Sequence, residues 1–415
     1  MKILLKAVRI SDPQSRHYRT SKDILIENGI IHKIATSLVD PDAETISIPQ
    51  LNVSQGWVDF KASFKDPGSD ESGGIQKGLD EAAKGGFTHV GVLPTDDPTA
   101  DHRAIIDYKI NASLHHAVQL HPIGAVTHNR NGLVLAELAD MAEGGVRWFS
   151  DDKSLSSNMM HKALLYTKDF QGKIIVQVYS HQFSSEFQVN EGKASTLTGL
   201  SGHPEVDERI EIFRAIELAK YTKRPLHISG ISAASSLPLI ENARKENVAI
   251  TCDVHLMNLC FTEENTLDFD TRYKLLPVLR SEEDRKALVQ ALKNKTIDAV
   301  VTDHRNMIAD LKDTTFDDAH FGTIQFPTAY AALGKFTELN SDQIVELLSI
   351  QNRITFGVKP HPVDVGNIAD LTLYTTEKEM IWTSEFSKAL SPFRNTHLEG
   401  NICGIVRGNQ WIINQ

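Results

Sequence analysis

The chain has 415 residues, of which 41% are hydrophobic and 23% are charged, and its formal net charge is −11. This is the composition of a large globular protein. The excess of acidic residues argues against a nucleic-acid partner, and no apolar run approaches the roughly 18 residues that a membrane span needs. The three cysteines have no CxxC spacing, which argues against a zinc knuckle or a disulfide framework and favours a cytoplasmic protein with reduced thiols.

The first 55 residues favour short strands separated by turns. The predicted strands cover residues 2–10, 23–26, 30–34 and 45–48. Asn28-Gly29 stands between the second and the third of them, and this dipeptide is a strong signal for a tight hairpin. The start of the chain therefore predicts a small β unit rather than a signal peptide.

From Gly56 onward, short apolar runs alternate with segments of helical periodicity. The runs lack apolar–polar alternation, which is typical of strands buried on both faces of a parallel sheet. We predict eight strands at residues 58–61, 90–93, 119–126, 146–149, 173–178, 225–228, 249–254 and 299–302. Helices are expected at 74–84, 133–143, 158–168, 208–221, 233–246, 281–293 and 342–349. This α/β pattern predicts a (β/α)8 TIM barrel over residues 56–356, with a doubly wound sheet as the alternative from the pattern alone.

Short strands return near the C-terminus, at residues 370–374, 380–383 and 402–406. Both ends of the chain are therefore rich in β structure and flank one barrel. The simplest arrangement is a small composite β-sandwich that is built from residues 1–55 and 357–415.

In a barrel of this kind, the catalytic groups lie at the C-terminal ends of the strands. Asp151 and Asp152 follow the fourth predicted strand, and Asp303 with His304 follows the last one. The last pair is typical of an active site, because it places an acid and then a histidine at a strand end. The two earlier aspartates are interpreted either as metal ligands or as capping and ion-pairing groups.

Histidines near the other strand ends stand alone. His181, His227 and His255 have no histidine at i+2 or i+4. A single histidine near a strand is more often structural than a metal ligand. Lys61 and Ser63, at the end of the first strand, are poor zinc ligands at neutral pH. The residues themselves therefore provide few ligands for a binuclear metal site.

Several segments, in the same order along the chain, resemble motifs of dihydroorotases of the amidohydrolase superfamily, in the long bacterial class. Residues 59–68 are similar to the D-x-H-x-H-x-R-x-P-G motif, 149–152 to F-S-D-D-G, 227–232 to H-I-x-H-V-S, and 299–304 to T-D-H with its preceding strand. Residues 23–29 and 406–408 resemble the first hairpin and the closing strand of the family. The resemblance implies the barrel fold, a place in pyrimidine biosynthesis, the closure of carbamoyl aspartate to dihydroorotate, and water activated by zinc.

The resemblance also shows which family residues are replaced. The four metal-binding histidine positions of the family hold Lys61, Ser63, Gln177 and Gly230. The remaining weak candidates for metal ligands are Asp151, Asp152 and Asp303. We therefore expect no metal cofactor, although the family uses zinc.

The substrate side of the site differs in the same way. Lys65 stands where the family has the arginine that grips the substrate carboxylate, so the charge is kept and the bidentate fork is lost. Thr95 and Leu276 replace two asparagines, and Arg305-Asn306-Met307 replaces A-P-H. Lys65 and Arg305 remain as candidate substrate-binding residues.

These replacements lead to the hypothesis of a catalytically silent dihydroorotase homologue. It resembles chains that some bacteria use as structural partners of aspartate transcarbamoylase, which implies a homo- or hetero-oligomer. The alternative is an active, divergent amidohydrolase that uses Asp303 with His304 and few or no metals. A third interpretation is a binding module whose cationic pocket of Lys61, Lys65 and Arg305 holds a small anion. We also expect Lys61 to fill the emptied site through an ion pair with Asp303.

Overall fold

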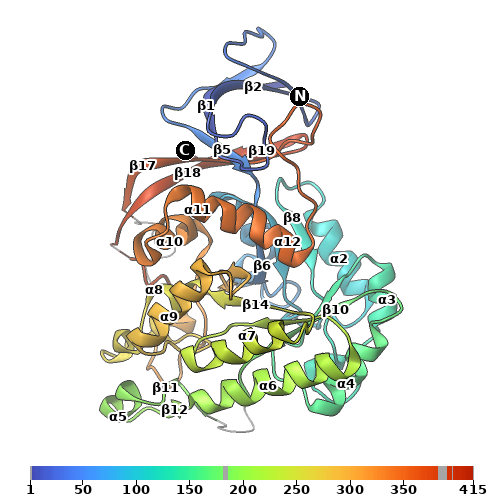
Figure 1. The fold of residues 1–415 in the computed structure, drawn as a ribbon, viewed down its shortest axis with the longest axis vertical. Helices are drawn as coiled ribbons and strands as arrows, with labels where there is room; N and C mark the ends of the chain where they lie inside the picture. The colour runs from blue at the N-terminus through green and yellow to red at the C-terminus, as the bar shows by residue number, and fades with distance from the viewer. Residues whose placement is uncertain (1, 181–185, 382–389, 395, 415) are drawn as a thin grey trace.

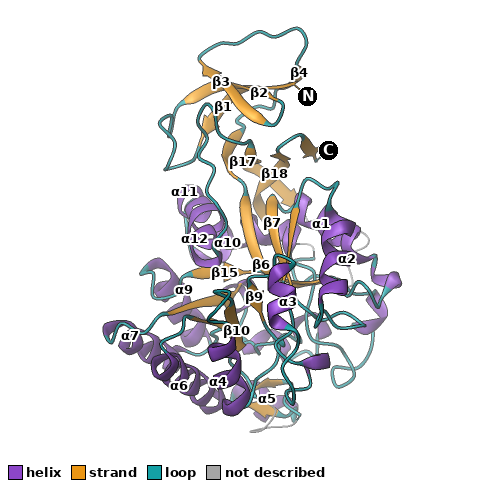
Figure 2. Cartoon of the chain, turned by 90° about the vertical axis from the view of Figure 1, so that its right-hand side faces the viewer, coloured by secondary structure: helices purple, strands orange, loops and turns teal. Residues whose placement is uncertain are grey.

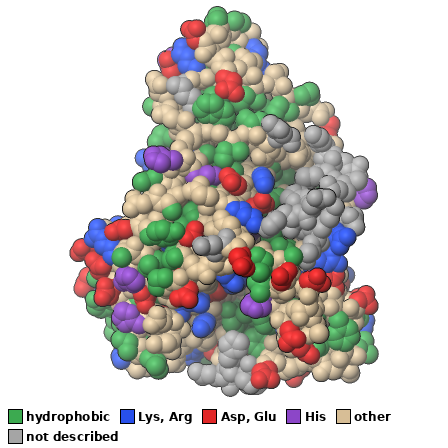
Figure 3. Space-filling view, turned by 180° about the vertical axis from the view of Figure 1, so that it is seen from behind, with side chains coloured by type: hydrophobic (Ala, Val, Ile, Leu, Met, Phe, Trp, Pro, Cys, Tyr) green, Lys and Arg blue, Asp and Glu red, His purple; other side chains and the backbone are tan. Residues whose placement is uncertain are grey.

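A computed structural model describes residues 2–180, 186–381, 390–394 and 396–414 of the chain. Figure 1 shows an α/β body and, above it, a β-rich unit that contains both termini. Figure 2 shows the same two parts from the side, with helices α4, α6 and α7 on the outside of the body. Acidic and basic side chains are interspersed over the rear face in Figure 3. Within the described residues, no helix is long and apolar enough to cross a membrane.

The strands of the body are parallel and buried. One sheet has the order β16-β6-β7-β8 and the other has the order β15-β14-β13-β10-β9. A parallel bridge between Gly124 and Phe149 connects the edge of the first sheet to the edge of the second. All eight strands predicted for this region are confirmed, and they neighbour one another in chain order. Their bounds are β6 (Trp57–Ser63), β7 (Phe87–Val92), β8 (Gln119–Pro122), β9 (Trp148–Phe149), β10 (Lys173–Gln177), β13 (Leu226–Ser229), β14 (Ile250–His255) and β15 (Ala299–Val301), with the short β16 (His304–Arg305) beside β6.

Helices follow most of the strands. Their bounds are α1 (Gly74–Lys84), α2 (Arg103–Ser113), α3 (Leu138–Glu143), α4 (Ser157–Tyr166), α5 (Lys193–Thr198), α6 (Glu205–Thr222), α7 (Leu237–Lys245), α8 (Leu256–Cys260), α9 (Glu282–Lys293), α10 (Ala329–Thr337), α11 (Ser341–Val345) and α12 (Asn352–Phe356). The short strands β11 (Val189–Asn190) and β12 (Gly202–His203) pair on either side of α5. Ser156 and Ser281 cap α4 and α9, because their hydroxyls accept hydrogen bonds from free backbone N–H groups of the first turn.

Two predicted helices differ from the structure. The helix expected at 133–143 begins only at Leu138, because Leu135 forms an antiparallel bridge with Thr127 and the segment before it is a loop. The helix expected at 342–349 is α11, which continues through a π-helical turn over residues 346–351 into α12. In both cases tertiary contacts override the local pattern.

The two ends of the chain share one eight-stranded sheet. Its order is β19-β18-β17-β5-β1-β2-β3, with β4 beside β1. Strand β17 pairs antiparallel with β5, which joins the C-terminal strands to the N-terminal ones. The hairpin predicted at Asn28-Gly29 is confirmed, and both residues have positive φ. The bounds are β1 (Lys2–Ile10), β2 (Ser21–Glu27), β3 (Ile30–Ala35), β4 (Glu44–Ile46), β5 (Asn52–Gln55), β17 (Asp370–Ile381), β18 (His397–Arg407) and β19 (Gln410–Ile413).

Candidate functional site

The ammonium group of Lys61 lies among the ends of several body strands. Lys61 belongs to β6, and its Nζ donates hydrogen bonds to Gln177 Oε1 at 2.8 Å and to Ser229 Oγ at 3.2 Å. It also lies 3.6 Å from Asp152 Oδ1. The Lys61 side chain is only 4% exposed. Side chains from β6, β10 and β13 and from the loop after β9 therefore converge on one buried cation.

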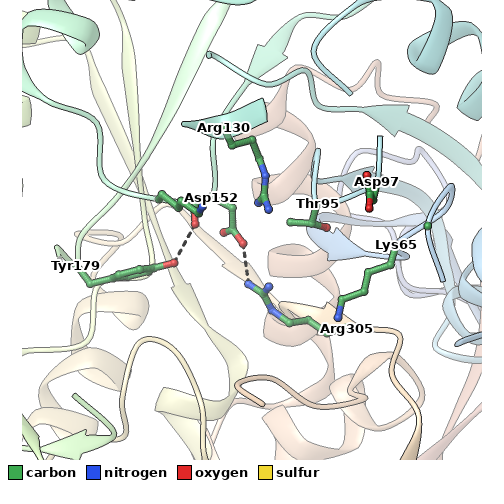
Figure 4. Close-up of a pocket in the computed structure, with 9 residues that line it drawn as sticks. Lys65, Thr95, Asp97, Arg130, Asp152, Tyr179 and Arg305 are labelled. Atoms are coloured by element: carbon green, nitrogen blue, oxygen red, sulfur yellow. Dashed lines mark hydrogen bonds and ion pairs between the residues drawn. The ribbon is translucent and has the colours of Figure 1, made fainter. Parts of the chain in front are cut away.

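Arg305 completes the cluster from the other side. Its Nε and Nη2 donate to the two carboxylate oxygens of Asp303 at 3.1 and 3.0 Å. The same Nη2 donates to Asp152 Oδ2 at 3.0 Å, as Figure 4 shows. This is the fork geometry in which arginine binds carboxylates most strongly. Two cations, Lys61 and Arg305, thus balance two carboxylates.

The charges shift one another as expected for such a cluster. Burial raises the pKa of Asp152, but Arg305 and Lys61 outweigh it and hold that pKa below its ordinary value. Burial by itself would lower the pKa of Arg305, but the charges of Asp303 and Asp152 outweigh burial and raise that pKa above its ordinary value. These shifts favour the charged forms of both Asp152 and Arg305, and the two groups are partners in one ion pair.

The predicted ion pair between Lys61 and Asp303 is wrong. Lys61 lies within 4.0 Å of a carboxylate oxygen of Asp152 and not of Asp303, which is paired with Arg305 instead. The left-handed backbone of Asp152 (φ 51°) and Asp303 (φ 53°) sets the direction of both side chains at their strand ends. An ion pair does fill the site, but with the partners exchanged.

Two other replaced positions lack groups that bind metals strongly. Ser63 shares a short hydrogen bond with the hydroxyl of Thr95. Gly230 has a φ of +85°, and a Cβ atom there would lie 2.9 Å from Pro277 Cγ and 3.1 Å from His255 Nε2. A histidine at this position would therefore require its neighbours to move.

Asp151 and His304 are both occupied within the fold. The Asp151 carboxylate accepts hydrogen bonds from the backbone N–H groups of Val126, at 2.7 Å, and Thr127, at 3.0 Å. The ring of His304 stacks on Phe326, its Nδ1 accepts from the Phe326 and Gln325 backbone, and its Nε2 bonds to Asn306. Burial lowers the pKa of His304 to about 3. The expected pairing of His304 with Asp303 at one site is therefore not found: His304 is a neutral histidine that holds a loop.

The three single histidines have different surroundings. His227 Nε2 lies 2.9 Å from Asp253, and its Nδ1 lies 2.8 Å from the Thr251 hydroxyl. His255 Nδ1 lies 3.9 Å from Asp303 Oδ2, and burial, together with the charge of Lys61, lowers its pKa to about 4. His181 lies outside the described residues.

These residues do not fit a binuclear zinc site. Zinc requires several neutral histidines or free carboxylates around the ion. Here the carboxylates of Asp152 and Asp303 both hold Arg305, and the ammonium of Lys61 lies beside them. Among residues 2–180, 186–381, 390–394 and 396–414, no group of three or more His, Cys, Asp or Glu side chains is arranged to hold a metal ion.

A pocket of about 440 Å³ opens onto this cluster (Figure 4). Its lining residues are Lys65, Gly68, Thr95, Asp97, Arg130, Asp152, Lys153, Tyr179 and Arg305. Four of them are cations and two are acids. The Tyr179 hydroxyl donates to the backbone oxygen of Asp152 at 3.0 Å, and Arg130 Nη1 lies 3.3 Å from the backbone oxygen of Asp151. Of the predicted residues, the structure brings together Lys65, Arg305 and Asp152 at this pocket, with Lys61 and Asp303 behind them.

Arg130 and Lys153 are pocket residues that the sequence interpretation did not single out. Arg130 lies in the loop after β8, several residues beyond the strand end, and no motif marks it. Lys153 follows the aspartate pair directly, and this adjacency was the available signal.

Comparison with known proteins identifies the family of the chain. Residues 49–409 match the model of the amidohydrolase family, so the chain belongs to this family. Within the family it is dihydroorotase-like. It is 32% identical to a dihydroorotase of Acetivibrio thermocellus over 98% of both chains, and 34% identical to one of Caldicellulosiruptor saccharolyticus over 96% of this chain and 94% of that one.

Solved structures show the same fold at lower identity. The L-hydantoinase (dihydropyrimidinase) of Arthrobacter aurescens superposes with a TM-score of 0.83 at 20% identity, over 99% of this chain and 96% of that chain. A D-hydantoinase structure also has a TM-score of 0.83, at 19% identity, over 100% and 96% of the two chains. At this level of identity the likeness concerns the fold alone.

Proposed function

We propose that this chain is a catalytically silent dihydroorotase homologue of pyrimidine biosynthesis, and that it acts in the cytoplasm as a structural partner of aspartate transcarbamoylase. The observation that supports the proposal most strongly is the position of the Lys61 ammonium, which lies beside Asp152 where the family resemblance places metal ligands. The side chains that occupy the site are what make it unsuitable for zinc.

The chemistry of the family explains why this matters. A metal ion turns water into a nucleophile by lowering its pKa to about 7. A lysine ammonium carries positive charge but has no vacant orbital with which to bind water or a substrate oxygen as a Lewis acid. Asp303, the candidate base, accepts two hydrogen bonds from Arg305 and is not free to take a proton. The replacements at Ser63 and Gly230 remove further ligand positions.

An inert site does not weaken the scaffold. We infer that the body closes as a (β/α)8 barrel over residues 56–356, because Asn352 Nδ2 donates to the carbonyls of Val58 at 2.7 Å and Val300 at 2.8 Å. This side chain bridges the first and last strands of the series. The composite β-sandwich of residues 1–55 and 357–415 is proposed as the second domain. Such a rigid body suits a role in which surfaces, rather than a site, are used.

Two measurements on the purified full chain test the proposal. After dialysis with Zn²⁺, we expect well under one zinc per chain and no hydrolysis of dihydroorotate, while a complete dihydroorotase assayed in parallel is active. When it is co-expressed with the aspartate transcarbamoylase of its own organism, the chain should elute with that enzyme as one complex. Stoichiometric zinc together with hydrolysis would overturn the silent site and favour the divergent amidohydrolase. Separate elution would overturn the partnership.

The excess of cations in the pocket favours a second candidate function, the binding of a small carboxylate anion without turnover. Lys65 and Arg305 both face the pocket in Figure 4. Titration calorimetry with dihydroorotate and carbamoyl aspartate tests this. We expect Lys65→Gln to weaken binding about tenfold, because one charged contact is worth about 1.5 kcal/mol. Lys162→Gln on the exposed face of α4 is the matched control. Equal binding by both variants would count against the pocket.

A further inference from the structure

The outward face of α6 carries large apolar side chains at helical spacing. Val206, Ile210, Phe213 and Tyr221 are exposed, with Phe213 at 56% and Tyr221 at 76%. A surface helix normally turns its apolar stripe inward and its polar residues to solvent. Helix α6 buries a second apolar face that includes Ile212 and Ile216, so the outer stripe is additional to the one that packs on the body.

The neighbouring helices show that this face is unusual. Helix α6 lies between α4 and α7 in Figure 1 and contacts both. The outer face of α7 exposes polar residues, among them Glu241, Asn242 and Lys245. The end of α4 also exposes two large apolar side chains, Leu165 and Tyr166. The rings of His161 on α4 and Tyr221 on α6 are 5.6 Å apart, so the two helices meet at this end of the stripe.

Two charged residues frame the centre of the stripe. Arg209 and Glu217 are both exposed, and each lies four residues, about one helical turn, from Phe213. Neither forms an ion pair or a side-chain hydrogen bond with any residue that the structure describes. The nearby cation Lys220 is different, because it is paired with Glu246. Equal distances from Phe213 and opposite signs make this arrangement self-complementary.

We propose that α6 is an interface between two copies of this chain, packed antiparallel about a two-fold axis that passes beside Phe213. The symmetry operation places Arg209 of one copy at the level of Glu217 of the other, and the pair occurs twice. Phe213 then packs against its own counterpart, with Val206 and Ile210 around it. A parallel pairing in register would place like charges opposite each other, which is unfavourable. This inference does not rest on the proposed function.

The size of the surface sets the expected affinity. One helix face and the end of a second make an interface at the low end of the range for specific complexes. We therefore expect a reversible dimer with a dissociation constant on the order of 10 µM, rather than a permanent one. Opposite charges at the rim should make its association weaken with added salt.

Charge reversal in the full-length chain tests the register. Sedimentation velocity over a roughly hundredfold range of concentration gives the dissociation constant. We expect Arg209→Glu and Glu217→Arg each to raise it at least about tenfold, because each change creates two like-charge contacts per dimer. The double variant Arg209→Glu/Glu217→Arg restores the opposite charges and should return to near the wild-type value. Circular dichroism and thermal melting confirm that each variant is folded.

Cysteine cross-linking tests the contact at the axis. The three native cysteines are buried, so Phe213→Cys introduces the one accessible thiol among the described residues. Under mild oxidation this variant should form a disulfide-linked dimer, while Lys245→Cys on α7 should not. A wild-type chain that stays monomeric throughout, a double variant that fails to recover, or equal cross-linking at both cysteines would each overturn the proposal. So would binding of aspartate transcarbamoylase to this face of an otherwise monomeric chain.

Discussion

Strand β6 carries a buried charged cluster at each of its two ends. The upper cluster, at the C-terminal ends of the body strands beside the pocket, consists of Lys61, Asp152, Asp303 and Arg305. The lower cluster, at the N-terminal ends of these strands and next to the terminal sheet that Figure 1 draws at the top, consists of His89, His121, Arg353 and Asp370, and Arg353 also donates to the backbone oxygen of Gly56 just before β6 begins. In the lower cluster, Arg353 lies 2.6 Å and His89 lies 2.9 Å from Asp370 Oδ2.

Both clusters consist of buried ion pairs, but they have different roles. The lower one ties the terminal sheet to the body, because Asp370 belongs to β17, His89 to β7 and Arg353 to α12. Burial raises the pKa of Asp370, but Arg353 and His89 hold it well below its ordinary value. The upper cluster occupies the place of an active site and also pairs its charges. It differs in that further cations, Lys65 and Arg130, lie on its open side without a matching number of acids. Ion pairing thus stabilises both ends, and the pocket beside the upper end is lined by more cations than acids.

The largest effect is expected at the lower end. Asp370→Asn removes the only carboxylate that Arg353 contacts among the described residues and leaves a buried guanidinium unpaired. We expect a loss of about 3–5 kcal/mol in the free energy of unfolding, measured by urea denaturation at pH 7. Asp313→Asn, at an exposed position, is the control. A loss below 1 kcal/mol would mean that the lower cluster does not hold the two parts together.

Removal of the upper lysine should have a smaller effect. Lys61→Met keeps the length of the side chain and leaves Asp152 still paired with Arg305. We therefore expect a loss of about 2 kcal/mol, less than for a pair broken completely. The double variant Lys61→Met/Asp152→Asn should lose less than the sum of the single changes, because the two residues interact. Strict additivity would show that Lys61 and Asp152 are independent.

The dependence on pH compares the two ends directly. Burial lowers the pKa of His121, in the lower cluster, to about 3, that of His255, beside the upper one, to about 4, and that of His304 to about 3. These rings are neutral in the folded chain and gain protons on unfolding below pH 6.5. Each of them therefore lowers the free energy of unfolding by about 1.4 kcal/mol for every pH unit below 6.5. Asp59 opposes them, because burial raises its pKa to about 7 and its folded form binds a proton below that value.

Together these four groups contribute a net loss of about 2 kcal/mol between pH 7 and pH 5.5. Urea denaturation at the two pH values measures it. His255→Asn should remove about one third of the histidine contribution if it folds, and His121→Asn should do the same from the other end. A stability that rises toward pH 5.5 would show that Asp59 outweighs the three histidines.

The sequence made much of this predictable, with limits that have physical causes. The eight body strands follow from their apolar runs, and Lys61, Asp152 and Arg305 follow from their positions at strand ends. Which acid pairs with which cation does not follow, because it depends on the left-handed turns at Asp152 and Asp303 and on side-chain directions across the ends of the body strands. Local sequence gives no sign of these.

Burial and exposure set further limits. His304 was expected to act in the site, yet both of its ring nitrogens form hydrogen bonds within the fold, with two backbone N–H groups and with the side-chain amide of Asn306. Partners 21 and 22 residues away in the chain cannot be predicted from a motif at a strand end. The exposed stripe of α6 could not be predicted for a similar reason. Ile212 and Phe213 are both large apolar residues, and only the packing shows which of them faces solvent.

The smallest effect is expected at Lys65, and it has the opposite sign. Burial, and then the neighbouring charge of Arg305, lowers the pKa of Lys65, and no carboxylate among the described residues pairs with it. A half-buried cation placed beside another cation destabilises the folded chain, as groups kept for binding often do. We expect Lys65→Met to raise the free energy of unfolding by about 0.5 kcal/mol while it weakens binding of a carboxylate anion. Lys65→Arg keeps the charge and should change neither stability nor binding greatly. If Lys65→Met instead destabilises the chain as Lys61→Met does, Lys65 belongs with the structural ion pairs, and the open side of the upper cluster has no cation reserved for a ligand.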